Sequence, residues 1–177
     1  LPSVSLEASA ADGFEIRIDK KAVTLESLAS TNYQVPIYVR MNEGHPGLCA
    51  MECGFSVDSR CQYEVIKTPR KALQVGGEIV DISVTHASNT YEGENITWMA
   101  WADSQDDDTL TNIVLIMVDV PKSAKKGDRY DIKYRSSGIN PKNPAKASPH
   151  LFMDRAGTDY VAAGAVQGFD GWILISG

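Results

Sequence analysis

Apolar and polar residues alternate along many short segments of this chain, and this period of two limits the possible folds more than any other feature. Residues 14–18 alternate, and residues 33–41, 48–57 and 130–135 do the same. Successive side chains of a β-strand point to opposite faces of a sheet, so each segment is predicted to be a strand with one buried face. We find no convincing helical periodicity over more than about ten residues. The sequence therefore predicts an all-β protein.

Further alternating or apolar segments bring the predicted set to about nine strands. They are residues 61–67, 78–85, 95–102, 111–120 and 172–175. Short strands at this spacing, separated by glycine, proline and asparagine, are typical of a β-sandwich or jelly roll. In the segment 48–57 the residues of one parity are expected to face its core: Cys49, Met51, Cys53, Phe55 and Val57. Ile139 to Gly168 departs from the pattern, and we expect a long ordered excursion there before the last strand, with a short helical turn near Ala162.

Length and charge narrow the class of protein. The 177 residues are 43% apolar, which is enough for one buried core, so a single domain over residues 1–177 is expected. The formal net charge of −6 leaves little basic surface, so we expect neither nucleic acid nor an anionic membrane as a partner. No stretch approaches the roughly 20 consecutive apolar residues of a membrane helix. The first residue is Leu1 rather than Met, which suggests a mature or excised fragment.

Cys49 and Cys53 are expected to be small core residues. An odd number, Cys49, Cys53 and Cys61, leaves at least one thiol unpaired within the chain. Cys49 and Cys53 are four residues apart on one predicted strand, a span of about 13 Å that exceeds disulfide reach. A zinc site of these cysteines with a histidine would have a spacing unlike the familiar ligand patterns. We expect no metal or cofactor on this chain.

Four aspartates crowd one predicted loop: Asp103, Asp106, Asp107 and Asp108. Calcium takes several oxygen ligands and glycoside cleavage takes two carboxylates, so both readings are open. The loop lacks the glycine and the final glutamate of an EF-hand, and such clusters usually mark a solvated hairpin tip. The sequence also lacks a Gly-x-Ser-x-Gly elbow, a His-Glu-x-x-His motif and a phosphate-binding loop. A non-catalytic role is therefore expected.

The predicted strand at residues 96–102 carries large apolar side chains at both parities. If Trp98 and Ala100 point into the core, then Thr97, Met99 and Trp101 point outward and expose an apolar stripe. The alternative is the opposite parity, or a loop that covers the stripe. Under the first assignment, Met99→Ala and Trp101→Ala leave folding intact but weaken partner binding by about 1 to 3 kcal/mol each. Asn95 and Thr97 also fit a glycosylation sequon, but within a strand so short a motif carries no weight.

Several short motifs follow one another in a recognisable order along most of the chain. They are Val35-Pro36-Ile37-Tyr38-Val39, residues 47–58, residues 96–104, Val118-Asp119-Val120-Pro121, Lys126-Gly127-Asp128, residues 130–134, and Phe169-Asp170-Gly171-Trp172-Ile173-Leu174-Ile175. Their order and spacing resemble the cohesin modules of bacterial cellulosome scaffoldins, which bind dockerin modules. The last motif is the sharpest single match. The longer excursion before it points toward the more divergent cohesins.

The resemblance implies a nine-stranded jelly-roll sandwich that presents one flat sheet face to a dockerin. On this sequence the face implied by the family is Ala50, Glu52, Gly54, Asp81, Ser83, Thr85, Thr97, Met99, Trp101, Lys133 and Arg135. The excursion at residues 139–168 lies beside that face and either covers it or adds contacts to it.

The resemblance also implies a biological role. It implies a non-catalytic, monomeric module, secreted or held on the bacterial cell surface, that assembles a cellulosome for polysaccharide degradation. The dockerin would bring its own calcium, and this chain would carry none. From the residues alone, a carbohydrate-binding β-sandwich that stacks Trp101, Trp98 or Tyr91 on sugar rings is the alternative, and a glycosidase that uses two of the loop aspartates is a third.

Overall fold

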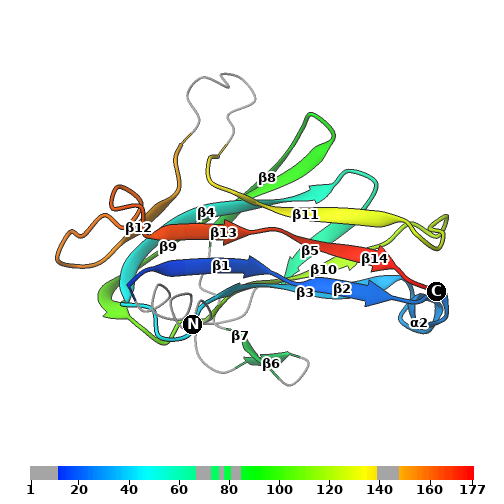
Figure 1. The fold of residues 1–177 in the computed structure, drawn as a ribbon, viewed down its shortest axis with the longest axis horizontal. Helices are drawn as coiled ribbons and strands as arrows, with labels where there is room; N and C mark the ends of the chain where they lie inside the picture. The colour runs from blue at the N-terminus through cyan, green and yellow to red at the C-terminus, as the bar shows by residue number, and fades with distance from the viewer. Residues whose placement is uncertain (1–11, 67–72, 76–77, 81–84, 139–147) are drawn as a thin grey trace, which may run out of the picture.

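Two β-sheets pack face to face and form a sandwich, as Figure 1 shows. The computed structural model describes residues 12–66, 73–75, 78–80, 85–138 and 148–177. Most residues in these ranges lie in strands, and one short helix, α2 (Leu25–Ser30), is present among them. The predicted all-β class and sandwich architecture are thus confirmed. No helix in the described part of the chain is long and apolar enough to cross a membrane.

The two sheets divide the strands almost evenly. One runs in the order β13-β1-β3-β10-β5, and the other in the order β2-β14-β11-β4-β9-β8 with β12 beside β4. The first contains β1 (Phe14–Ile18), β3 (Gln34–Met41), β5 (Gln62–Ile66), β10 (Asn112–Asp119) and β13 (Val166–Phe169). The second contains β2 (Lys20–Val23), β4 (Leu48–Asp58), β8 (Thr85–Tyr91), β9 (Glu94–Asp107), β11 (Arg129–Arg135), β12 (Leu151–Met153) and β14 (Gly171–Ile175). A separate hairpin consists of β6 (Leu73–Val75) and β7 (Glu78–Val80).

The first and last strands pass from one sheet to the other together. β1 continues through Asp19 into β2, and β13 continues through Asp170 into β14. β1 pairs with β13 and β2 pairs with β14, in both cases in parallel. A Cβ at Gly171 would lie 2.2 Å from the Asp19 carbonyl oxygen, so the crossing requires glycine. The crossing closes one side of the sandwich, and the sheet edges β5 and β8 lie on the other side.

The core fills the space between the sheets and is built from the alternating residues of each strand. Cys53, Phe55 and Val57 of β4 are fully buried, as predicted, whereas Cys49 is only partly buried. All three cysteines are free thiols. Burial raises the pKa of Cys53 and of Cys61 to about 12, which is typical of inert core thiols.

Helix α2 was not predicted, because six residues are too few to show helical periodicity. Thr24 caps its N-terminus: the Thr24 Oγ1 accepts from the Ser27 backbone N–H at 3.0 Å, and the Ser27 hydroxyl oxygen accepts from the Thr24 N–H at 3.1 Å. Leu28 is its buried residue. Leu25 is partly buried against the core as well, so the helix depends on its cap and on these two leucines.

Some predicted strand boundaries differ from the structure. β9 continues to Asp107 instead of ending at Ala102, so the aspartates occupy the end of a strand and the turn after it. The segment predicted at 78–85 contains β7 and the first residue of β8, and residues 81–84 lie outside the described residues. Fourteen strands occur in the described ranges, where the sequence predicts about nine.

The predicted excursion adds a strand to the second sheet. β12 pairs with the first half of β4, where β11 has already ended. After β12, a hydrogen-bonded turn closes where the Ala163 N–H donates to the Asp159 carbonyl at 3.1 Å, near the predicted helical turn. The chain then enters β13. Residues 139–147 of the excursion lie outside the described residues.

Candidate interaction surface

The register between β4 and β9 fixes which side of β9 faces the core. Residues directly opposite on neighbouring strands share one face of a sheet. The core residues of β4 lie opposite the predicted outward stripe, in the pairs Phe55 with Thr97, Cys53 with Met99, and Met51 with Trp101. Thr97 and Met99 are 0% exposed and Trp101 is 5% exposed. The predicted outward orientation of these three side chains is therefore wrong.

The error has a local physical cause. Residues 96–102 are apolar at both parities, so the sequence of β9 alone cannot distinguish its two faces. β4 alternates cleanly, so its pairing with β9 shows which side of β9 faces the core. Trp101 in the core cannot stack on a sugar ring, which removes it from the carbohydrate-binding alternative.

The outer face of the second sheet carries the other parity of both strands. In the register, Glu52 lies opposite Ala100, Gly54 opposite Trp98, and Ala50 beside Ala102. Ala50, Glu52 and Ala100 are partly exposed, and Ala102 is exposed. The predicted contribution of Ala50 and Glu52 to this face thus agrees with their placement.

Trp98 packs against backbone on this face. A Cβ at Gly54 would lie 2.7 Å from the indole ring, and one at Gly138 would lie 3.1 Å from it. The indole thus occupies the space that two side chains would otherwise fill. Its Nε1 donates to the Glu52 Oε1 at 3.4 Å. Gly54 belongs to the predicted face, but it is buried beneath Trp98 and serves as the floor.

β12 widens the same face. Leu151 and Met153 are partly exposed and pair with Glu52 and Ala50, while Phe152 between them is buried in the core. A shallow depression of about 390 Å³ lies here. We call it the alanine trough, and its lining is Ala50, Met51, Glu52, Ala100, Trp101, Ala102 and Leu151. Neither β12 nor the trough was predicted, because both depend on a pairing between distant segments.

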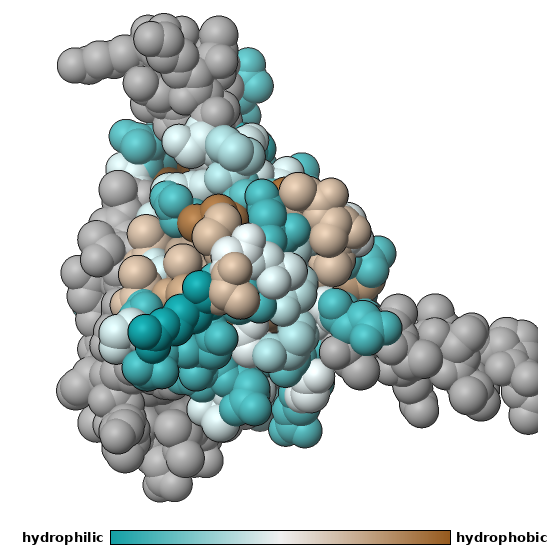
Figure 2. Space-filling model, turned by 90° about the vertical axis from the view of Figure 1, so that its left-hand side faces the viewer, coloured by the Kyte–Doolittle hydropathy of each residue, from teal (hydrophilic) through white to brown (hydrophobic). Residues whose placement is uncertain are grey.

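The end of the sandwich where β12 lies is mixed in character. Figure 2 looks onto this end and shows moderately hydrophobic residues interspersed with hydrophilic ones, without one broad strongly hydrophobic area among the coloured residues. This end of the sandwich therefore offers both apolar and polar side chains.

β11 supplies the charged margin predicted for the face. Lys133 is exposed and lies opposite Ser56, and Arg135 lies opposite Gly54. The Arg135 guanidinium is 3.7 Å from the Glu94 carboxylate, which also accepts a hydrogen bond from the Ser56 hydroxyl at 2.7 Å. Asp81 and Ser83 lie outside the described residues, and Thr85 belongs to β8, where its side chain is not described.

The aspartates predicted at a solvated tip hold turns together. The Asp107 Oδ1 accepts from the backbone N–H groups of Thr109 and Leu110 at 2.8 and 3.1 Å. The Asp106 Oδ1 accepts from the Arg155 N–H at 2.8 Å and ties the excursion to β9. Within the described residues, no group of three or more His, Cys, Asp or Glu side chains is placed to hold a metal ion.

The two described histidines with perturbed pKa values serve the fold. His45 donates through Nε2 to the Leu110 carbonyl at 2.9 Å and accepts through Nδ1 from the Gly47 N–H at 3.1 Å, and burial lowers its pKa. His150 Nδ1 and the Tyr134 hydroxyl share a hydrogen bond of 2.7 Å, and burial lowers the pKa of His150 as well. Burial also raises the pKa of Tyr134.

Several solved structures of cohesin modules are similar to this one. A type III cohesin from the cell-surface anchoring scaffoldin ScaE of Ruminococcus flavefaciens gives a TM-score of 0.60 at 14% identity, over 96% of this chain and 91% of that one. The sixth cohesin of scaffoldin B from Acetivibrio cellulolyticus, solved in complex with a Cel5 dockerin mutant, gives 0.57 at 14% identity, over 93% and 99%. A non-cellulosomal cohesin from the archaeon Archaeoglobus fulgidus gives 0.53 at 8% identity, over 93% and 92%.

These similarities establish the fold. The chain has the cohesin fold, a jelly-roll β-sandwich, as the resemblance of its motifs implied. No protein-family model matches the sequence, and no curated protein matches it. At 8 to 14% identity, the likeness to these three structures is one of fold.

Proposed function

We propose that this chain is a non-catalytic module that binds a dockerin through the outer face of its β2-β14-β11-β4-β9-β8 sheet. The observation that carries the proposal is the pairing of β12, β4 and β9, which places the alanine trough and Trp98 together on one face of a cohesin fold. Cohesins with this fold have been solved with dockerins bound, including the Acetivibrio cellulolyticus module.

The chemistry of the face suits a helical partner. Three alanines leave room above the sheet for large apolar side chains of the partner, and Leu151 and Trp98 flank that space. Tryptophan is enriched among the few residues that carry most of the binding energy of an interface. Glu52 in the trough and Lys133 at the margin favour opposite charges on the partner. Such charges affect orientation and association rate more than affinity.

The wider role follows from the same proposal. The module would recruit a dockerin-bearing protein to a scaffoldin outside the cell or on its surface. The dockerin, rather than this chain, would carry the calcium. We expect the module to act as a monomer, because its binding face is complementary to a different chain.

A titration against a panel of dockerins tests the proposal. At least one dockerin should bind, and Ala100→Arg, which fills the trough with a charged side chain, should weaken that binding at least tenfold. Arg17→Ala is the matched control, because Arg17 is exposed on β1 in the other sheet. Circular dichroism would confirm that both variants fold. Binding that survives Ala100→Arg unchanged, or a panel without any binder, would contradict the proposal.

A further inference from the structure

His150 lies where the chain enters β12, and backbone hydrogen bonds hold this entry against the segment that follows β11. The His150 N–H donates to the Ser136 carbonyl at 2.7 Å, and the Gly138 N–H donates to the Ser148 carbonyl at 2.7 Å. Leu151, the next residue, lines the alanine trough. The packing of His150 therefore bears directly on the outer face of the second sheet.

The His150 side chain is inserted among aromatic rings at this end of the core. The centre of its ring lies 5.9 Å from that of Tyr134 and 6.0 Å from that of Phe152, in edge-to-face arrangements. Phe152 is fully buried and packs in turn on Phe14, at 5.4 Å between ring centres. His150 itself is partly buried. A positive charge on this ring would therefore lose part of its hydration.

A hydrogen bond with Tyr134 requires a neutral His150. The Tyr134 hydroxyl and the His150 Nδ1 are 2.7 Å apart. Burial raises the pKa of Tyr134, so its hydroxyl keeps its proton at neutral pH. Within the described residues this proton has no acceptor other than the His150 Nδ1. The hydroxyl therefore donates to an unprotonated ring nitrogen.

The surroundings of His150 do not compensate a charge on it. Tyr134 of β11 is the titratable group in contact with the ring, and Cys53 of β4, near Tyr134, keeps its proton because burial raises its pKa to about 12. Burial lowers the pKa of His150, and among the described residues no carboxylate raises it. Charged side chains of the adjoining segments have partners of their own: Asp170 bonds the Tyr134 N–H, Asp154 the Thr158 N–H and Glu52 the Trp98 indole, and Arg135 lies beside Glu94.

Protonation of His150 removes the bond from Tyr134. A protonated imidazole donates through both nitrogens and accepts through neither. The Tyr134 hydroxyl proton then has no acceptor among the described residues. Once released from the core, the ring takes up a proton at the ordinary histidine pKa of about 6.5. Release is therefore favoured as the pH falls from 6.5 toward the lowered pKa of the packed ring.

We propose that His150 is an acid-sensitive anchor of β12. When its ring is protonated, the entry to β12 detaches from Tyr134 and Leu151 leaves the alanine trough. The release is local, because β12 is short and pairs with β4 over three residues. The consequence for binding rests on the proposed function: the affinity for a dockerin falls in a mildly acidic medium.

Hydrogen exchange of the intact chain at pH 7 and pH 5 tests the proposal. The His150 and Tyr160 amides donate to the Ser136 and Phe152 carbonyls and so report on both ends of β12. Their protection factors, which correct for the effect of pH on intrinsic exchange, should fall by about threefold or more between pH 7 and pH 5. A pKa of about 6.5 in the released state limits this fall to about 25-fold.

The two histidine variants separate this local effect from the rest of the fold. His150→Gln should abolish the fall, because a glutamine side chain accepts the Tyr134 hydroxyl at either pH. His45→Gln should keep it, because His45 bonds Leu110 and Gly47 instead. Equal protection at both pH values in the parent, or an equal fall in His150→Gln, would overturn the proposal.

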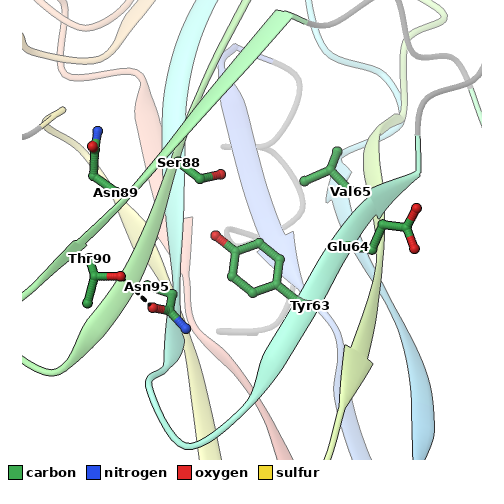
Figure 3. Close-up of a pocket in the computed structure, with 7 residues that line it drawn as sticks. All are labelled: Tyr63, Glu64, Val65, Ser88, Asn89, Thr90 and Asn95. Carbon is green, nitrogen blue, oxygen red and sulfur yellow. Dashed lines mark hydrogen bonds between the residues drawn. The ribbon is translucent and has the colours of Figure 1, made fainter.

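A pair of tyrosine variants tests the hydrogen bond itself. Tyr134→Phe removes the donor to His150 and should reduce the dependence on pH. Tyr63→Phe is the matched control, because the Tyr63 hydroxyl bonds the Thr97 hydroxyl, which does not titrate. Figure 3 shows Tyr63 in the cleft between β5 and β8, with its hydroxyl toward Ser88. A dependence on pH that Tyr134→Phe leaves unchanged would exclude this bond as the cause.

The exchange measurement needs no dockerin, so its outcome is independent of the proposed function. With a dockerin that binds at pH 7, the affinity of the parent should fall about threefold more at pH 5 than that of His150→Gln. An equal loss of affinity in the two chains would refute the effect on the trough.

Discussion

Gly54 lies directly beneath Trp98 on the outer face of the sheet, so close that a Cβ at Gly54 would be 2.7 Å from the indole ring. The position of the tryptophan therefore depends on the absence of a side chain on the neighbouring strand. The same contact makes the outer face easy to disturb without touching the core.

Gly54→Ala should displace Trp98 and destabilise the fold by about 1 to 3 kcal/mol, as overpacking of a tight contact does. The added methyl group would also meet the Thr97 carbonyl oxygen at 2.8 Å, so it cannot be accommodated by the indole alone. Urea unfolding gives the loss of stability, and tryptophan fluorescence reports the displaced ring. Ala22→Val adds apolar volume at an exposed position of β2 and serves as control. An unchanged unfolding midpoint in Gly54→Ala would refute this close packing.

Met99→Ala and Trp101→Ala should each destabilise the protein by about 2 to 5 kcal/mol, because both side chains are buried in the core. This replaces the expectation from sequence that the two variants keep their folding and lose only partner binding. Chemical denaturation measures the difference. Lys133→Ala, at an exposed position of β11, is the control and should change stability by less than about 0.5 kcal/mol. Native stability in both core variants would mean that β9 faces the other way.

The fold should lose stability as the pH falls below about 6.5, the ordinary pKa of histidine. Burial lowers the pKa of His45 in the folded state, so below pH 6.5 the unfolded chain takes up a proton that the folded chain excludes. The protonated ring can no longer accept the Gly47 N–H bond.

The dependence should reach at most about 1.4 kcal/mol per pH unit for each such histidine, until the folded state also protonates. Urea titrations between neutral and mildly acidic pH measure it. His45→Gln should flatten the curve, and His150→Gln provides the comparison because burial lowers the pKa of His150 too. A His45→Gln curve as steep as that of the parent would exclude His45 as the source.

Asp106→Ala should release the excursion locally while leaving the rest of the fold intact. The Asp106 carboxylate accepts the Arg155 backbone N–H at 2.8 Å, and a charge-assisted bond of this kind is worth about 1.5 to 3 kcal/mol. Hydrogen exchange at the Arg155 amide should therefore accelerate by roughly tenfold or more. Asp108→Ala, at the exposed neighbouring turn, should leave that amide as slow as in the parent.

The sequence predicts strands best where alternation is strict. β1 coincides with its predicted segment, and β5 and β11 lie within a residue of theirs, because one apolar face per strand leaves one way to bury it. β3 and β10 also lie within a residue of their predicted segments, although consecutive residues are buried in both. The same reasoning failed for β9, because the adjacent residues Trp98 and Met99 are both large and apolar. Only the register with β4 shows which of the two faces the core. Most of the predicted fold was therefore correct.

The candidate site was less predictable than the fold. Ala50 and Glu52 were assigned to the correct face, because β4 alternates cleanly. Leu151 and Met153 could not be assigned to this face from the sequence, because they reach it by pairing with residues about one hundred positions away in the chain.

The parallel pairing of the first strands with the last ones has a mechanical consequence. Tension applied between the two ends of the chain would pull β2 and β14 in opposite directions along their length. The hydrogen bonds between β2 and β14 would then bear the force together, in shear, and would not break one after another. A module tethered at both ends against flowing liquid would resist being pulled apart through this seam.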